Sequence, residues 1–126
     1  MNAIGNMLQN SIRILKDEDY QRKVWFRDES TDVSCYTETV SHFLRTSGLI
    51  IKDPNCIVQL GEQNFSLLEH LHYLIKEHRG LLMERIDPDC MEENELLDDP
   101  NWQDIQTLSE DLFIKLTDFV TRRSNE

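Results

Sequence analysis

The residues that could carry chemistry in this sequence are four histidines, three cysteines and a large number of carboxylates. His70 and His72 lie two positions apart on an expected helix, so their side chains point about 200° apart and cannot share one metal ion. His42 follows Cys35 after about 10 Å of helical rise, which is too far for the hydrogen bond that would activate a thiol. The chain also lacks a zinc-binding Cys/His spacing, a phosphate-binding glycine loop and the GxSxG motif of hydrolases. We therefore predict no catalytic residue, no metal site and no cofactor, and we expect that the protein is not an enzyme.

The carboxylates crowd into one stretch, residues 84–99. A calcium-binding loop beginning at Asp87 would need an oxygen ligand where Met91 stands and a glycine where Glu92 stands, so the calcium motif fails. A solvated acidic face and a surface for a basic protein remain as explanations, ahead of a metal site of another kind. The eight acidic residues, which accompany the single basic residue Arg85, are Glu84, Asp87, Asp89, Glu92, Glu93, Glu95, Asp98 and Asp99.

The whole chain is acidic, with a formal net charge of −11. Residues 1–63 carry 7 basic and 9 acidic side chains, a balance of −2, whereas residues 64–126 carry 6 and 15, a balance of −9. A phosphate backbone repels such a surface, so we expect no direct binding of nucleic acid. The same field attracts a basic protein and accelerates its encounter, and plain solubility is the alternative explanation of the charge.

Two tryptophans are candidates for anchoring a partner, because tryptophan is enriched at interface hot spots. Trp102 comes directly after the acidic stretch and could form the apolar centre of a charged rim. Trp102 and Trp25 also lie in phase with apolar neighbours, so packing in the core is the alternative. The predicted partner-binding site consists of the eight carboxylates together with Trp102.

Periodic apolar residues predict the helices that would position these groups. A first helix is predicted over residues 4–15, a second over 34–48 and a third over 64–80, with the last two each ended by a glycine. A final helix is predicted to begin with Asp99 as its cap and Pro100 as its first residue. Its apolar face is formed by Trp102, Ile105, Leu108, Leu112, Leu116, Phe119 and Val120.

The segment 49–60 differs from the rest, because Asp53, Pro54 and Asn55 form a turn signal between two short runs with β-branched residues. It is predicted as a loop, with a small hairpin or a short extended segment as alternatives. Four to five amphipathic helices in 126 residues predict one all-α domain, 1–126, built as a compact bundle.

The cysteines and the first residues of the chain indicate the cellular compartment of the protein. Three widely spaced cysteines without a CxxC pair favour a reducing environment. The opening stretch MNAIGNMLQNSIRILK lacks the basic start and continuous apolar run of a signal peptide. No apolar run reaches the roughly 20 residues that span a bilayer. We therefore expect a cytoplasmic protein that makes no membrane contact.

A short acidic helical chain with carboxylates crowded near a tryptophan resembles the bacterial immunity proteins, including those paired with contact-dependent growth-inhibition and other polymorphic toxins. The stretch ERIDPDCMEENELLDDPNW carries this resemblance. It implies a stoichiometric inhibitor that binds a cognate toxin, often a basic nuclease, and blocks its active site. A helical adaptor that docks a partner through an apolar groove is the alternative function, and a small enzyme with a dispersed site is a third. The oligomeric state is left open.

Overall fold

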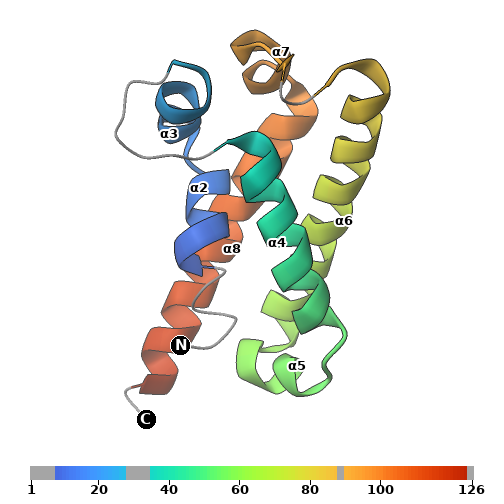
Figure 1. Ribbon diagram of the computed structural model, residues 1–126. Helices are drawn as coiled ribbons and strands as arrows, with labels where there is room; N and C mark the ends of the chain where they lie inside the picture. The colour runs from blue at the N-terminus through green and yellow to red at the C-terminus, as the bar shows by residue number, and fades with distance from the viewer. Residues whose placement is uncertain (1–7, 28–34, 88–89, 125–126) are drawn as a thin grey trace.

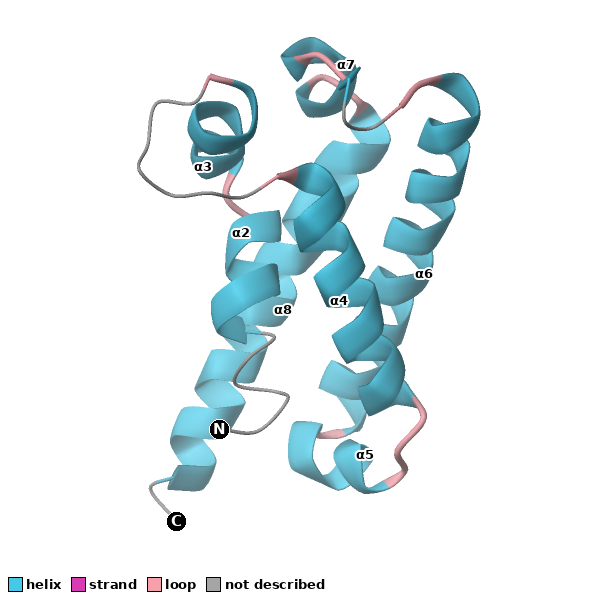
Figure 2. Ribbon diagram, in the orientation of Figure 1, coloured by secondary structure: helices cyan, strands magenta, loops and turns pink. Residues whose placement is uncertain are grey.

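The computed structural model describes residues 8–27, 35–87 and 90–124. Every regular element in these ranges is helical, as Figure 2 shows, which confirms the all-α prediction. The longest helices are α4 (Tyr36–Ile51), α6 (Glu62–Arg85) and α8 (Pro100–Ser124). The shorter elements are the π-helical turns η1 (Leu8–Ile12) and η2 (Gln21–Phe26) and the α-helices α2 (Arg13–Leu15), α3 (Glu18–Tyr20), α5 (Asn55–Leu60) and α7 (Glu93–Leu97).

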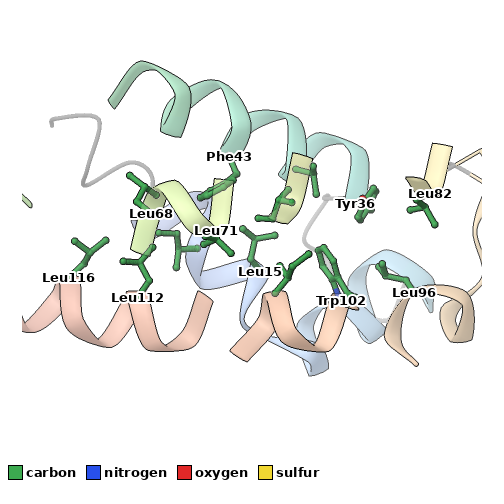
Figure 3. Close-up of a cluster of buried hydrophobic side chains, with 14 of the residues drawn as sticks. Leu15, Tyr36, Phe43, Leu68, Leu71, Leu82, Leu96, Trp102, Leu112 and Leu116 are labelled. Atoms are coloured by element: carbon green, nitrogen blue, oxygen red, sulfur yellow. The ribbon is translucent and has the colours of Figure 1, made fainter. Parts of the chain in front are cut away.

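The long helices lie side by side, and α6 runs in the direction opposite to α4 and α8 (Figure 1). α6 packs against both of them, while η1 contacts α4 and α8, and α2 contacts α8. Together with the N-terminal helical segment they form the predicted compact bundle. Figure 3 shows side chains from these helices pointing toward one another in the core. The largest fully buried side chains are Ile12, Leu15, Phe43, Leu60, Leu68, Leu71, Ile75, Leu82, Leu96, Leu97 and Trp102.

A buried glutamine, Gln21, fastens the N-terminal segment to α8. Its Nε2 donates to the carbonyl oxygens of Ile14 (2.8 Å) and Leu15 (2.9 Å). These carbonyls lie at the end of a helix, where the backbone leaves acceptors without intrahelical partners. Its Oε1 accepts from Trp102 Nε1 (3.0 Å) and from Gln106 Nε2 (2.8 Å). The amide is completely buried, yet both of its N–H groups and both lone pairs of its oxygen have partners.

Two glycines that were predicted to end helices lie inside them instead. α4 continues past Gly48, and α6 continues past Gly80. The reason is burial just beyond each glycine, because Ile50 is 2% exposed and Leu82 is 1% exposed. Burying one such side chain stabilises the fold by about 1.5–3 kcal/mol, which exceeds the roughly 1 kcal/mol that glycine costs inside a helix.

The prediction of a loop, hairpin or extended segment at 49–60 is wrong, because α4 and α5 cover most of it. The turn signal itself is real: Asp53 Oδ1 accepts from the Asn55 N–H (3.0 Å) and the chain turns into α5 there. The buried side chain of Leu60 holds α5 against the bundle. Gly61 then joins α5 to α6 with a φ of 85°, a conformation that L side chains rarely adopt.

Helix starts depend on capping side chains. The predicted start of α8 is confirmed, since Asp99 Oδ1 accepts from the Asn101 N–H (2.9 Å) and Pro100 is the first helical residue. α4 begins with Cys35, whose Sγ accepts from the Glu38 N–H (3.4 Å). The predicted cap Ser34 and residues 4–7 of the first predicted helix lie outside the described residues.

Candidate functional site

A hollow of about 660 Å³ lies between α6 and α8. Its apolar lining comes from Leu74 and Leu81 on α6 and from Ile105 and Leu108 on α8. Leu81 is 52% exposed and Leu74 and Leu108 are partly exposed, whereas Ile105 is 1% exposed and lies at the base of the hollow. Three carboxylates also line the hollow: Glu77, Asp104 and Asp111.

A second hollow of about 530 Å³ adjoins the first where α7 meets α6 and α8, and the two share His78, Leu81 and Asn101. We refer to both together as the α6–α8 groove. Among the residues that line it, Arg85 is the one lysine or arginine. The second hollow contributes four carboxylates, all of them part of the predicted site: Glu84, Glu95, Asp98 and Asp99.

Two acidic residues of the predicted site begin α7. The Glu92 side chain accepts from the backbone N–H of Glu95, and Glu95 Oε1 accepts from the Glu92 N–H (3.0 Å). This reciprocal arrangement is a capping box, which satisfies donors that the first helical turn leaves free. Negative charge is also favoured at this positive end of a helix. Part of the acidic stretch therefore has a local structural role as well.

Glu93 holds α7 against the N-terminal segment. It forms ion pairs with Arg22 (Nε to Oε1, 2.6 Å) and with Arg27 (Nη2 to Oε1, 3.2 Å), and its side chain is about two-thirds buried. Charge-assisted hydrogen bonds of this length are stronger than neutral ones. Glu93 therefore already has two ion-pair partners within the protein.

Asp99 links the groove to the core. Besides capping α8, it accepts through Oδ2 from His78 Nε2 (3.0 Å), and the His78 ring lies 5.6 Å from that of Trp102. Burial raises the pKa of the Asp99 carboxyl, but the hydrogen bonds from His78 and from the Asn101 backbone outweigh burial and hold this pKa below its ordinary value. Because a carboxylate only accepts, the proton between the two side chains lies on His78 Nε2.

Replacing Asp99 with alanine is expected to lower the free energy of unfolding by about 1–3 kcal/mol at pH 7, because α8 loses its cap and His78 keeps a buried nitrogen without a partner. A carboxyl with a lowered pKa stabilises the fold above its unfolded pKa, and this contribution is lost as the pH falls through the folded pKa. The gap between wild type and Asp99→Ala should therefore narrow as the pH drops below 3.8.

Urea denaturation followed by circular dichroism between pH 7 and pH 3 measures both effects. Asp98→Ala is the matched control, because Asp98 is the exposed neighbour and its side chain has no hydrogen-bond partner among the described residues. A gap that stayed constant across this pH range would contradict the role given to the Asp99 carboxylate.

Five carboxylates in the groove have no ion-pair partner in the described part of the chain: Glu77, Glu84, Glu95, Asp98 and Asp104. Asp111 pairs with Lys115 (3.1 Å), but both side chains are about half exposed, and such pairs contribute little to stability. The groove therefore carries unneutralised negative charge beside exposed apolar surface.

The remaining predicted residues lie elsewhere. Trp102 is completely buried and packs against Trp25 (6.2 Å between ring centroids) and Tyr36 (5.5 Å), so the core alternative holds and the expectation of an exposed anchor is corrected. The hydrogen bond to Gln21 explains why the indole is inside. Asp87 is exposed just after α6, and Asp89 lies outside the described residues.

Sequence reasoning missed the half of the groove formed by Glu77, Asp104 and Asp111, because these residues lie outside the dense stretch 84–99. The signal was a seven-residue spacing. Glu77 and Glu84 are two helical turns apart on one face of α6, as Asp104 and Asp111 are on α8. Their common face becomes visible only when the two helices are placed side by side.

The histidines divide between the two sides of α6. His70 and His78 line the groove, whereas His72 Nδ1 contacts Ser47 Oγ of α4 (2.7 Å). Burial, together with the charge of Lys76, lowers the pKa of His72. His70 and His72 therefore point apart as predicted. Across residues 8–27, 35–87 and 90–124, no three His, Cys, Asp or Glu side chains gather as metal ligands.

The fold and the groove together define an all-α domain with an acidic, partly apolar groove between two antiparallel helices. No family model, curated protein or solved structure matches this chain. Among the described helices, none is long and apolar enough to cross a membrane.

Proposed function

We propose that this protein is a non-catalytic binding protein that holds a basic protein in the α6–α8 groove. The observation that carries the proposal is the charge of the groove: three carboxylates in the first hollow and four in the second face a single arginine, Arg85. A surface of this kind attracts a cationic protein over a distance and orients it before contact.

The function in this class that fits best is that of an immunity protein, which neutralises a cognate toxin in the cytoplasm. A nuclease-type toxin needs a basic surface to hold phosphate. Carboxylates on a rigid helical scaffold compete for the same arginines, with bidentate bonds that fix the orientation. Occupying that surface keeps the nucleic acid out and requires no chemistry from the inhibitor.

The second candidate is an adaptor that docks a partner mainly through apolar contacts. The exposed apolar lining of the groove, above all Leu81, favours it. The two candidates predict different effects of neutralising the groove carboxylates on partner binding. An inhibitor of a basic protein loses its partner when the carboxylates are neutralised, whereas an apolar adaptor keeps its partner.

Neutralising Glu84→Gln and Asp98→Asn together is expected to weaken capture of the partner by about tenfold or more, because each desolvated charge-assisted contact contributes on the order of 1 kcal/mol or more. The tagged protein is purified from its host at about 50 and about 300 mM salt, which brackets the range in which exposed charges become screened. A basic protein retained in one-to-one ratio at low salt is then titrated against wild type and variant by isothermal calorimetry.

Glu62→Gln with Glu110→Gln is the matched control, since it removes the same amount of charge from exposed helical positions outside the groove. The proposal predicts wild-type affinity for this control. Equal losses in the two double variants would show that only net charge matters, and the groove would then not be the binding site.

A further inference from the structure

We infer that the element of the basic partner that occupies the α6–α8 groove is a single amphipathic helix, with an apolar ridge flanked on both sides by lysine or arginine. This inference rests on the proposed function and specifies its binding mode. Three observations support it. The groove has an apolar lining, acidic residues lie along both of its sides, and the backbone groups of the two helices that form it are already hydrogen-bonded.

The floor of the groove has the shape that a helix ridge requires. Leu74 and Leu81 are two turns apart on α6, a separation of about 10 Å along the helix axis. Ile105 and Leu108 lie opposite them on α8. Apolar residues repeated at i, i+3 or i+4, and i+7 on an incoming helix match this spacing. From His70 to Arg85 the groove follows α6 for about 22 Å, the length of a helix of roughly 15 residues.

The charges line both rims of this floor. Glu77 and Glu84 lie along the α6 side, and Asp104 and Asp111 lie along the α8 side. Figure 1 shows these two helices running side by side. A partner with basic residues on one flank alone would leave one acidic rim unpaired. The complementary ligand therefore carries positive charge on both flanks of its apolar ridge.

An extended peptide fits this groove less well. A strand binds mainly through its backbone groups, which need free donors and acceptors such as those of a sheet edge. The backbone groups of α6 and α8 along the groove are already paired within the helices, as in any α-helix interior. A helix satisfies its own backbone and presents only side chains, so it is the element that this surface can accept.

His78 forms part of the wall of the groove. It is 6% exposed and lines both hollows, and its Nε2 is bonded to Asp99. Its buried Nδ1 has no hydrogen-bond partner among the described residues. Because Nδ1 is buried, it offers no direct contact to a bound helix, and His78 serves to shape the wall of the groove.

A second copy of this chain is a poor occupant of the groove. Each copy carries a net charge of −11, and its own groove is acidic, so two copies repel each other. The charge that disfavours self-association is the charge that favours a cationic helix.

The test uses three synthetic peptides of about 16 residues, labelled with a fluorophore and read by fluorescence anisotropy. The first has leucine at i, i+4, i+7 and i+11 with lysine on both flanks. The second has the same composition with the leucine stripe scrambled, and the third has glutamate in place of lysine. The first is expected to bind more tightly than either control by about tenfold or more, because it alone combines a continuous apolar ridge with positive flanks.

Variants of the protein locate the site. Leu81→Ser is expected to weaken binding of the first peptide about tenfold, whereas Leu49→Ser, at an exposed leucine of α4 outside the groove, leaves it within about twofold. Thr107→Arg places a cation in the groove and should reduce binding further. Chemical-shift changes in ¹⁵N-labelled protein should follow α6 and α8.

The outcomes separate this inference from the function on which it rests. Equal binding of the striped and scrambled peptides, or equal effects of Leu81→Ser and Leu49→Ser, would overturn the helix-in-groove mode. If the native partner was nevertheless lost on neutralising Glu84 and Asp98, the proposed function would stand with a flat, charge-dominated interface. If neither peptide nor protein depended on the groove, both proposals would fail.

Discussion

Replacing Trp102 with alanine is expected to lower the free energy of unfolding by about 3–5 kcal/mol, the range observed for truncating a buried large aromatic side chain. Trp102 has no exposed surface and lies among the rings of Trp25, Tyr36 and His78. Its removal leaves a cavity where the N-terminal segment, α4, α6 and α8 meet. It also takes away one of the two donors to the Gln21 amide oxygen. A protein with a total stability of about 5–15 kcal/mol loses a large part of it.

Chemical denaturation followed by circular dichroism measures this loss of stability. Two further variants separate the contribution of the indole N–H from that of the buried ring and provide an exposed-ring control. Trp102→Phe keeps an aromatic ring but removes the indole N–H, so its cost should be clearly smaller. Tyr73→Ala removes a ring that is 62% exposed and should change stability by about 0.5 kcal/mol or less. If Trp102→Ala were as mild as Tyr73→Ala, the indole would not be part of the core, and its role as a partner anchor would have to be reconsidered.

The second large effect is expected for Gln21→Leu, at about 2–4 kcal/mol, although leucine has nearly the same size and is more apolar. The substitution leaves the Trp102 N–H and the carbonyls of Ile14 and Leu15 without their hydrogen-bond partner. Each buried polar group left without a partner costs about 1–3 kcal/mol, and relaxation of the chain recovers part of the total. The loss should come with reduced helicity, because the N-terminal segment detaches from α8.

Hydrogen exchange distinguishes this mechanism from a general weakening of the core. In Gln21→Leu, amides of residues 11–26 should lose protection more than amides in the middle of α6. Gln63→Leu, at an exposed glutamine of α6, is the control and should leave stability within about 0.5 kcal/mol of wild type. A uniform loss of protection along the chain would count against the fastening role of Gln21.

The predictable part of the fold depends on local chemistry. The start of α8 follows from Asp99 and Pro100, because capping uses neighbouring residues. The ends of α4 and α6 were predicted too early, since Gly48 and Gly80 are local stop signals that distant packing overrides. The prediction for segment 49–60 was wrong for the same reason: its β-branched residues suit a strand, but the described part of the bundle contains no strand to pair with.

The candidate site was predictable in part. Its dense acidic half is visible in one stretch of sequence, whereas the apolar floor and the second acidic rim come from residues far apart in the chain. Trp102 shows the complementary difficulty. A tryptophan beside charged residues suits either a surface or a core, and what decides it here is Gln21, a hydrogen-bond acceptor 81 positions away. No local pattern contains that partner.

That same long separation between Gln21 and Trp102 bears on how the chain is made. A ribosome releases the N-terminal segment well before Trp102 and Gln106 on α8, the residues that complete its contacts. The Gln21 amide therefore lacks its partners on α8 until that helix has been synthesised, and α4 and α6 can pair before the N-terminal helices dock. Native contacts this far apart slow folding, so attachment of the first helices is expected to be the late step.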